Sequence, residues 1–312
     1  MPLSLKASTD DDGRRLDRIL RKALPDMPLS AVHRLLRQGC VRVNEKAAAA
    51  NLRIHSGDLI TLPDNDFFTS NHTNTGAKLQ KSADFIVPMI LFEGGGLLII
   101  NKPAGIVVHG NESLTDLVIS YLKPKLPPSL SFAPGPLHRL DRQSSGVLAF
   151  SASLEGARQF SAMMRQRLIK KQYLAIVEGL IEKPEIWQDE LIRSGHHRKT
   201  YSKPKPGAVS KTAVTKVKPL ASNSLSTLIL AEIETGRTHQ IRAQAAGRAH
   251  PLLGDRKYGA ALIPEYSGCF YLHAWRMELP PPLSVLLEAP LPQKFRKKIF
   301  EFYKVDSLHA IV

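Results

Sequence analysis

An aspartate flanked by arginines lies in the polar half of residues 138–150, which read His-Arg-Leu-Asp-Arg-Gln-Ser-Ser-Gly-Val-Leu-Ala-Phe. The apolar half predicts a buried strand that begins at Gly146, so Asp141 lies in the loop that leads into this strand. Arg139 and Arg142 favour an ionised Asp141, and a positioned carboxylate can act as a nucleophile or as a base. A purely structural ion pair in the loop is the alternative, because ion-pair networks produce similar clusters.

Two further stretches are rich in groups that bind anions. Residues 234–242 read Glu-Thr-Gly-Arg-Thr-His-Gln-Ile-Arg and predict a turn followed by the start of a helix, whose backbone amides can hold a phosphate. Residues 191–218 contain eight Lys or Arg and no Asp or Glu, which favours phosphate contacts. A capped helix with solvated charges and a solubilising loop are the respective structural alternatives.

Composition narrows the class of protein. The 312 residues carry a formal net charge of +15, and 43% are hydrophobic, which is enough for a sizeable core. The two cysteines, Cys40 and Cys269, cannot build a disulfide framework, and the histidines lack the spacing of metal ligands. Neither a signal peptide nor an apolar run of membrane-spanning length is present. These features predict a soluble, cytoplasmic protein without a metal whose large partner is a polyanion.

A small basic module is expected at the N-terminus. Residues 14–24 predict a helix with one apolar face, and its other face carries Arg14, Arg15, Arg18, Arg21 and Lys22. A second short helix begins after Ser30, which is typical of an N-cap, and ends at Gly39. A closing strand follows at Leu59–Leu62. These elements predict a helix–helix–strand module of about sixty residues.

The remaining chain predicts a larger domain rich in strands. Residues 63–83 are rich in Asn, Thr and Ser and predict a flexible linker. Buried strands are then expected at Leu97–Ile100, Gly146–Phe150, Tyr173–Val177 and Thr227–Ile233. Ser153 caps a predicted helix whose apolar face comprises Leu154, Ala157, Phe160, Met164 and Leu168. Because strands and helices do not alternate regularly, the fold class is α+β with a mixed, largely antiparallel sheet. The tail Asp306–Val312 is expected to be loose.

Four stretches, taken in order, resemble the motifs of the RluA-type family of ribosomal RNA pseudouridine synthases over nearly the whole chain. Residues 101–106, with His109, resemble the family's upstream strand–turn motif, and residues 138–150 resemble its catalytic-aspartate motif. Residues 171–175 resemble the motif that carries its active-site tyrosine. Residues 235–242, with 250–255, resemble its last motif. Residues 14–62 resemble the αL RNA-binding domain of members that modify large-subunit rRNA.

The resemblance implies an αL domain at 12–62, a linker at 63–84 and a pseudouridine synthase domain at 85–305. The implied activity is isomerisation of uridine to pseudouridine in large-subunit ribosomal RNA, free or in an assembly intermediate. It implies a monomer that consumes no cofactor. The one departure inside the aspartate motif, Ser144 in place of the usual Thr, keeps the hydroxyl group.

The resemblance also implies roles for individual residues. Asp141 is the essential carboxylate, which either attacks the anomeric carbon of the ribose or assists departure of the uracil anion through a glycal-like species. Arg242 pairs with Asp141, and Tyr173 packs on the target base and is a candidate base. Arg139 enters the space that the flipped uridine vacates. The basic residues expected to contact RNA phosphates are Arg14, Arg15, Arg18, Arg34 and Arg37.

Two other functions are consistent with the same residues. One is a catalytically silent RNA-binding or ribosome-assembly protein that keeps the fold, against which the presence of Asp141, Tyr173 and Arg242 argues. The other is a basic hydrolase that uses Asp141 with His138, although no second carboxylate lies nearby in the sequence.

Overall fold

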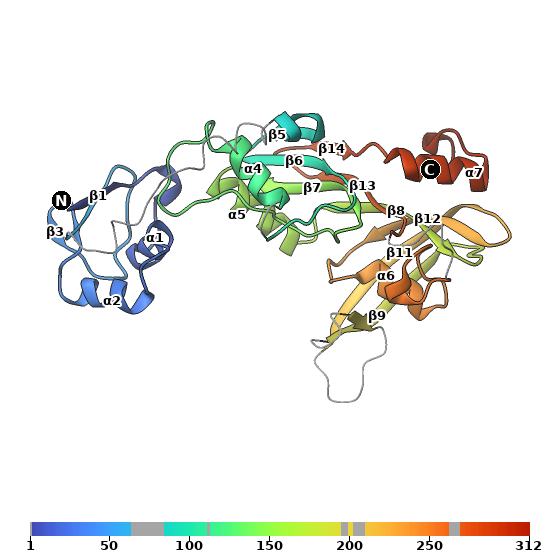
Figure 1. The fold of residues 1–312 in the computed structure, drawn as a ribbon, viewed down its shortest axis with the longest axis horizontal. Helices are drawn as coiled ribbons and strands as arrows, with labels where there is room; N and C mark the ends of the chain where they lie inside the picture. The colour runs from blue at the N-terminus through green and yellow to red at the C-terminus, as the bar shows by residue number, and fades with distance from the viewer. Residues whose placement is uncertain (1, 64–83, 111–112, 195–198, 202–209, 262–268) are drawn as a thin grey trace.

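The computed structural model describes residues 2–63, 84–110, 113–194, 199–201, 210–261 and 269–312. A small N-terminal domain (residues 3–62) lies at one end of an elongated molecule, and a larger part built on one extended sheet forms the rest (Figure 1). Nearly all of the predicted linker falls outside the described residues. None of the described helices combines the length and the apolar character that a membrane span needs.

The N-terminal domain packs two helices against a small antiparallel sheet. Its elements are β1 (Leu3–Lys6), α1 (Leu16–Ala23), α2 (Leu29–Arg37), β2 (Arg42–Val43), β3 (Lys46–Ala47) and β4 (Leu59–Leu62), and the strand order is β1-β4-β2-β3. The predicted helices and the closing strand are confirmed, and Leu16, Ile19 and Leu20 are fully buried. The sequence analysis missed β1, which is four residues long and too short for a clear period. The expected Ser30 cap is wrong, because α2 begins at Leu29 with Pro28 as its N-cap.

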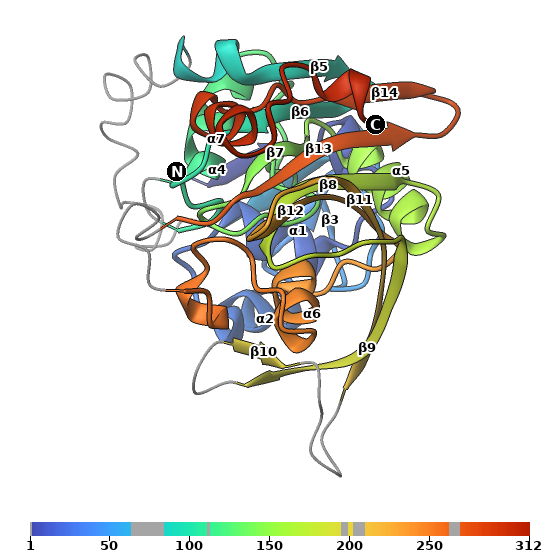
Figure 2. The same ribbon diagram turned by 90° about the vertical axis from the view of Figure 1, so that its right-hand side faces the viewer.

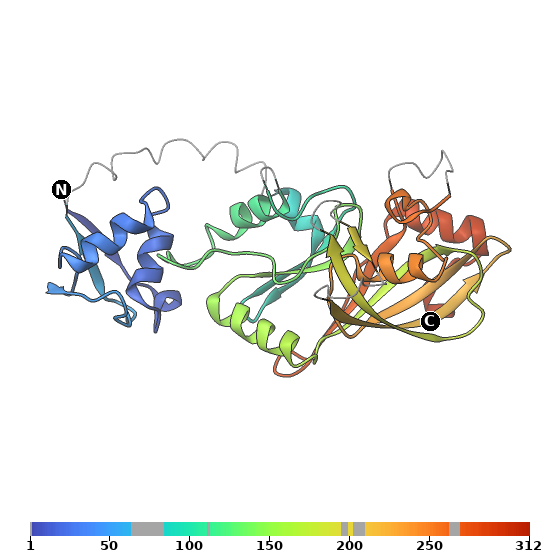
Figure 3. The ribbon, with the colours of Figure 1, turned by 90° about the horizontal axis from the view of Figure 1, so that it is seen from below.

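A buried carboxylate holds the N-terminal domain against the larger part. Asp11 is fully buried and accepts hydrogen bonds from the Ser129 hydroxyl and the Ser131 backbone amide, at 3.0 and 2.9 Å. Arg14 Nη1 donates to the Ser131 carbonyl at 3.0 Å. Figures 1 and 3 show the loop that carries residues 129–131 reaching toward the N-terminal domain. Direct contact therefore joins the two parts, in addition to the connecting chain.

The larger part is built on a mixed sheet in the order β10-β9-β11-β12-β8-β13-β7-β6-β5, with β14 on β13 (Figure 2). Its described strands are β5 (Ile90–Gly94), β6 (Leu97–Lys102), β7 (Ser145–Ser151), β8 (Lys170–Glu178), β9 (Glu185–Ser194), β10 (Lys199–Tyr201), β11 (Lys211–Ser222), β12 (Ser226–Ile233), β13 (Leu272–Leu279) and β14 (Val285–Glu288). The pair β13–β7 is parallel and the other described pairs are antiparallel. This confirms the predicted α+β class.

Four helices pack on this sheet. They are α4 (Leu114–Leu122) and α5 (Leu154–Arg165), which pack on β6 and β7, and α6 (Gln240–Gly247) and α7 (Gln293–Tyr303), which pack on β8 and β12. In α5, Ser153 accepts a hydrogen bond from the Gly156 amide, which confirms the predicted cap. Leu168 was expected on the buried face but is exposed, because α5 ends before Arg167, whose positive φ turns the chain.

The C-terminal tail is packed rather than loose. Leu308 and Ile311 contact the buried cluster that contains Trp275 and the α7 residue Phe295. A short 3-10 helix at Leu308–Ala310 turns these apolar side chains toward the cluster. Leu308 and Ile311 therefore anchor the tail to the core. The sequence analysis missed this packing because two apolar residues among polar ones do not form a recognisable period.

Candidate active site

Asp141 lies in a tight turn immediately before β7. The Ser144 amide donates to the Asp141 carbonyl at 3.1 Å, and the side chain of Asp141 is 23% exposed at the wall of a cleft. Gly146 has a φ of +110°, and a Cβ at that position would lie 2.1 Å from the Ala274 carbonyl oxygen. Glycine therefore lets β7 approach β13 closely, and this approach brings the turn beside the residues that follow β12.

Lys102, at the end of β6, donates hydrogen bonds to the backbone of this turn. Its fully buried ammonium donates to the carbonyls of Pro103, Arg142 and Ser144, at 2.8, 3.1 and 2.7 Å. Burial lowers the pKa of Lys102 to about 8, and the nearby charge of Asp141 opposes this shift. The bonds to the Arg142 and Ser144 carbonyls fix the backbone that immediately follows Asp141, and the bond to Pro103 orients the ammonium from its own segment.

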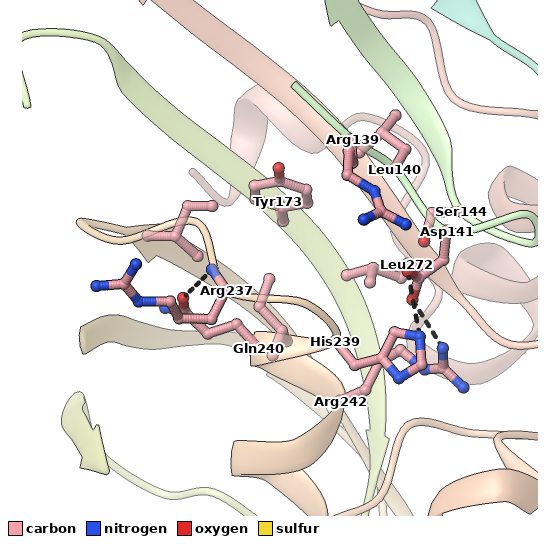
Figure 4. Close-up of a pocket in the computed structure, with 12 residues that line it drawn as sticks. Arg139, Leu140, Asp141, Ser144, Tyr173, Arg237, His239, Gln240, Arg242 and Leu272 are labelled. Carbon is pink, nitrogen blue, oxygen red and sulfur yellow. Dashed lines mark hydrogen bonds and ion pairs between the residues drawn. The ribbon is translucent and has the colours of Figure 1, made fainter. Parts of the chain in front are cut away.

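Arg242, in the first turn of α6, joins two carboxylates. Its Nη1 donates to Asp141 Oδ2 at 2.7 Å, while Nε and Nη2 donate to the two oxygens of Asp255 at 2.6 and 2.8 Å. The guanidinium is buried between the rings of Phe270 and Tyr258, with centroids at 4.2 and 4.9 Å. Burial alone would lower the pKa of Arg242, but Asp255 and Asp141 raise it overall. The pairing of Arg242 with Asp141 is thus present (Figure 4).

His239 lies on the other side of Asp141, and the sequence analysis assigned it no role. Its Nε2 is 3.6 Å from Asp141 Oδ1, and its Nδ1 is 2.8 Å from the hydroxyl of Tyr258. Burial lowers the pKa of His239, which keeps the ring neutral near pH 7. Both His239 and Asp255 fall in the stretches that resemble the last motif, which is the one sequence signal that could have selected them.

Tyr173 and Arg139 lie on the wall of the same cleft. Tyr173 is on β8 and is 7% exposed, and Figure 4 shows the Arg139 guanidinium between the Tyr173 ring and Asp141. Burial, reinforced by the charge of Asp141, raises the pKa of Tyr173, so its hydroxyl stays neutral. The guanidinium of Arg237 points away from Asp141, because its Nε donates to the Thr212 carbonyl at 3.0 Å.

His138 does not act together with Asp141 in this arrangement. Its Nε2 accepts a hydrogen bond from the Ala149 amide at 3.1 Å, and its ring stacks on Phe160. Burial lowers the pKa of His138 to about 3, in agreement with an unprotonated Nε2. This engagement argues against the hydrolase alternative.

The basic residues expected to contact RNA differ in their availability. Arg14 is bound to Ser131, and Arg15 pairs with Asp17 at 2.7 Å. Arg18, Arg34 and Arg37 are exposed on α1 and α2. The basic stretch at 191–218 lies partly outside the described residues. The three exposed arginines are thus the stronger candidates for phosphate contacts.

Two family models match parts of the chain, and known proteins are similar to it over most of its length. Residues 96–247 match the family model described as RNA pseudouridylate synthase, and residues 14–60 match the S4 domain. A ribosomal large subunit pseudouridine synthase C of Vibrio parahaemolyticus is 31% identical, covering 95% of this chain and 96% of the relative. A ribosomal large subunit pseudouridine synthase D of Nitrosomonas europaea is 34% identical, covering 90% and 82%.

A solved structure supports the fold. Human RNA Pseudouridylate Synthase Domain Containing 4 superposes with a TM-score of 0.61 at 23% identity, covering 71% of this chain and 95% of that one. The fold and the site together define an RNA-modifying enzyme with an added S4 domain. More specifically, the chain belongs to the RNA pseudouridylate synthase family.

Proposed function

We propose that this chain isomerises specific uridines of large-subunit ribosomal RNA to pseudouridine, with Asp141 as the essential carboxylate. The observation that carries the proposal is the ion pair between Arg242 and Asp141 at 2.7 Å in the wall of a cleft. Relatives that align over most of their length are named for this activity on the ribosomal large subunit. We further expect a cytoplasmic monomer that acts on free rRNA or on an assembly intermediate.

The reaction requires a carboxylate, and its substrate and product have the same atomic composition. The bond between N1 of uracil and C1′ of ribose breaks, the base turns, and C5 bonds to C1′. The proton on C5 is lost and N1 gains one, so the reaction balances as an isomerisation. Arg242 holds Oδ2 of Asp141, and His239 Nε2 lies 3.6 Å from Oδ1, beyond hydrogen-bond distance, so Oδ1 is the oxygen that can act on the substrate. Both routes remain open: Oδ1 attacks C1′, or it stabilises the positive charge that develops there as uracil leaves.

Tyr173 and Arg139 fit supporting roles. The target base must leave its stack to reach the cleft, because the reacting bond is inaccessible inside a helix. A neutral, largely buried Tyr173 ring suits packing on the flipped uracil. Arg139 is exposed beside Asp141 and is long enough to enter the space that the base vacates.

The test is a conversion assay with Asp141→Asn. Asparagine keeps the shape of the side chain but lacks the anion, so we expect turnover to be abolished while RNA affinity stays within several-fold, since binding is spread over many phosphate contacts. A wild-type rate for this variant contradicts the assignment of Asp141. Wild-type protein that binds rRNA without forming pseudouridine identifies the silent RNA-binding alternative. Pseudouridine mapping in rRNA from cells without this gene identifies the target positions.

A further inference from the structure

Lys171, on β8, is a buried cation in the wall of the cleft, and none of the described residues gives it an anionic partner. Its side chain is 7% exposed and lines the same cleft of about 620 Å³ as Asp141 and Tyr173. Within the described part of the chain, its Nζ donates to the thioether of Met164 alone, at 3.8 Å, and thioether sulfur is a weak acceptor. No carboxylate of the described residues lies within ion-pair distance of this ammonium.

Two other lysines of the same domain, Lys170 and Lys102, have the partners that the Lys171 ammonium lacks. Lys170, one position earlier on β8, is exposed and pairs with Glu278 at 3.0 Å. Lys102 is also buried, but three carbonyls accept its hydrogen bonds. A buried ammonium that lacks both kinds of partner is destabilising, and burial lowers the pKa of Lys171 accordingly. An anion that enters the cleft would supply the partner that this ammonium lacks.

The charge of the cleft identifies the class of that anion. Its described lining includes two further cationic side chains, those of Arg139 and Lys257, and also Arg237, whose guanidinium is turned toward the Thr212 carbonyl. The one acid in this described lining is Asp141, which pairs with Arg242 at 2.7 Å. Such a surface attracts the backbone of a nucleic acid.

The position of Lys171 on β8 places its ammonium beside the site expected for the flipped uracil, and not on the uracil itself. Lys171 and Tyr173 point to the same side of β8, and residues two apart on a strand lie about 7 Å apart. If Tyr173 packs on the flipped uracil, the ammonium of Lys171 lies beside the nucleotide. We propose that Lys171 binds a backbone phosphate of the substrate RNA next to the flipped nucleotide. This inference rests on the proposed function for the identity of the ligand.

The direct test compares Lys171→Met with the matched control Lys170→Met on the same strand. We expect Lys171→Met to weaken binding of a target rRNA fragment by about tenfold or more. The dependence of log affinity on log salt should become shallower by about 0.7 for a single-stranded contact. Lys170→Met should change neither quantity. The urea midpoint of Lys171→Met should equal or exceed that of wild type, because the variant removes a buried, unpaired charge.

A phosphate scan locates the contact and does not depend on folding of the variant. Neutral methylphosphonates replace, one at a time, the phosphates flanking the target uridine, and affinity for the wild-type protein is measured. We expect one position to weaken binding about as much as Lys171→Met does, and the two changes together to cost no more than either alone. Additive losses at every position, or no sensitive position, overturn the proposal.

Two other outcomes also overturn it. Unchanged affinity with a large loss of single-turnover rate at saturating RNA assigns Lys171 to the uracil instead. Unchanged affinity with a lowered urea midpoint makes it a residue of the core. The affinity and salt measurements do not require conversion of uridine. They remain informative if the protein fails to form pseudouridine, so failure of the proposed function is distinguishable from failure of this inference.

Discussion

Replacement of Arg242 by methionine should separate its role in catalysis from its role in folding. The wild-type guanidinium makes three charged hydrogen bonds of 2.6 to 2.8 Å, two to Asp255 and one to Asp141. Methionine fills similar space between Phe270 and Tyr258 but leaves both carboxylates without a cation. Asp255 is only 2% exposed, so its uncompensated charge should dominate the loss of stability.

The expected magnitudes follow from this arrangement. Removing one partner of a buried ion pair destabilises a protein by about 3–5 kcal/mol. The single-turnover rate should fall by about 100-fold or more, because Asp141 loses the donor that orients it and a misplacement of about 1 Å has that effect. Arg242→Lys should recover part of the rate, since one ammonium cannot serve two carboxylates in the planar geometry of a guanidinium.

A second substitution tells the two effects apart. Adding Asp255→Asn to Arg242→Met removes the buried negative charge, and we expect about 2 kcal/mol or more of the lost stability to return. The rate should stay low, because Asp141 still lacks its partner. Urea unfolding measures stability, and single-turnover conversion at saturating RNA, well below the unfolding temperature, measures the rate.

The matched control is Arg248→Met, at the C-cap of the same helix. Arg248 also pairs with a carboxylate, Asp189, at 2.7 Å, but does not line the cleft. Its loss should lower stability by less than the loss of Arg242 and leave the rate unchanged. Recovery of the rate in the variant that combines Arg242→Met with Asp255→Asn would refute an active-site role for Arg242. Full rescue of Arg242→Met by saturating RNA would show that Arg242 contacts phosphate.

Three other expectations concern RNA binding, metal dependence and pH. Arg34→Gln combined with Arg37→Gln should reduce the salt slope of RNA binding by somewhat less than one unit per lost phosphate contact, measured by filter binding, and an unchanged slope contradicts RNA contact by α2. Conversion of a short unstructured RNA should proceed in excess EDTA, because a carboxylate isomerisation needs no Lewis acid; loss of activity that one divalent ion restores argues otherwise. Burial lowers the pKa of His273 from 6.5 to about 4. As the pH falls, the imidazole is therefore protonated in the unfolded chain before it is protonated in the folded one. The free energy of unfolding should fall by about 3 kcal/mol between about pH 6.5 and pH 4. His273→Gln should flatten that part of the urea stability profile, and an equally steep profile contradicts the assignment.

Local patterns predicted most of the elements that carry the site. The apolar runs at β6, β7, β8 and β12 were recognisable because a buried strand requires consecutive apolar residues. The α1 and α5 helices were recognisable from their amphipathic period, although the end of α5 was not. Arg167 adopts a positive φ there, and nothing in its residue type indicates this conformation.

The sequence by itself determined the family, the α+β class and the position of Asp141, because these depend on residue order and on short periods along the chain. Only the tertiary structure decided how the side chains are partnered. Asp255 and Asp141 meet on one guanidinium, Asp11 is buried against the loop at 129–131, and Lys171 is buried without an anion. Each of these features depends on segments distant in sequence meeting at hydrogen-bond distance, or failing to meet. A side chain's charge is encoded locally, but its burial and its partners are set by the packing of the whole sheet.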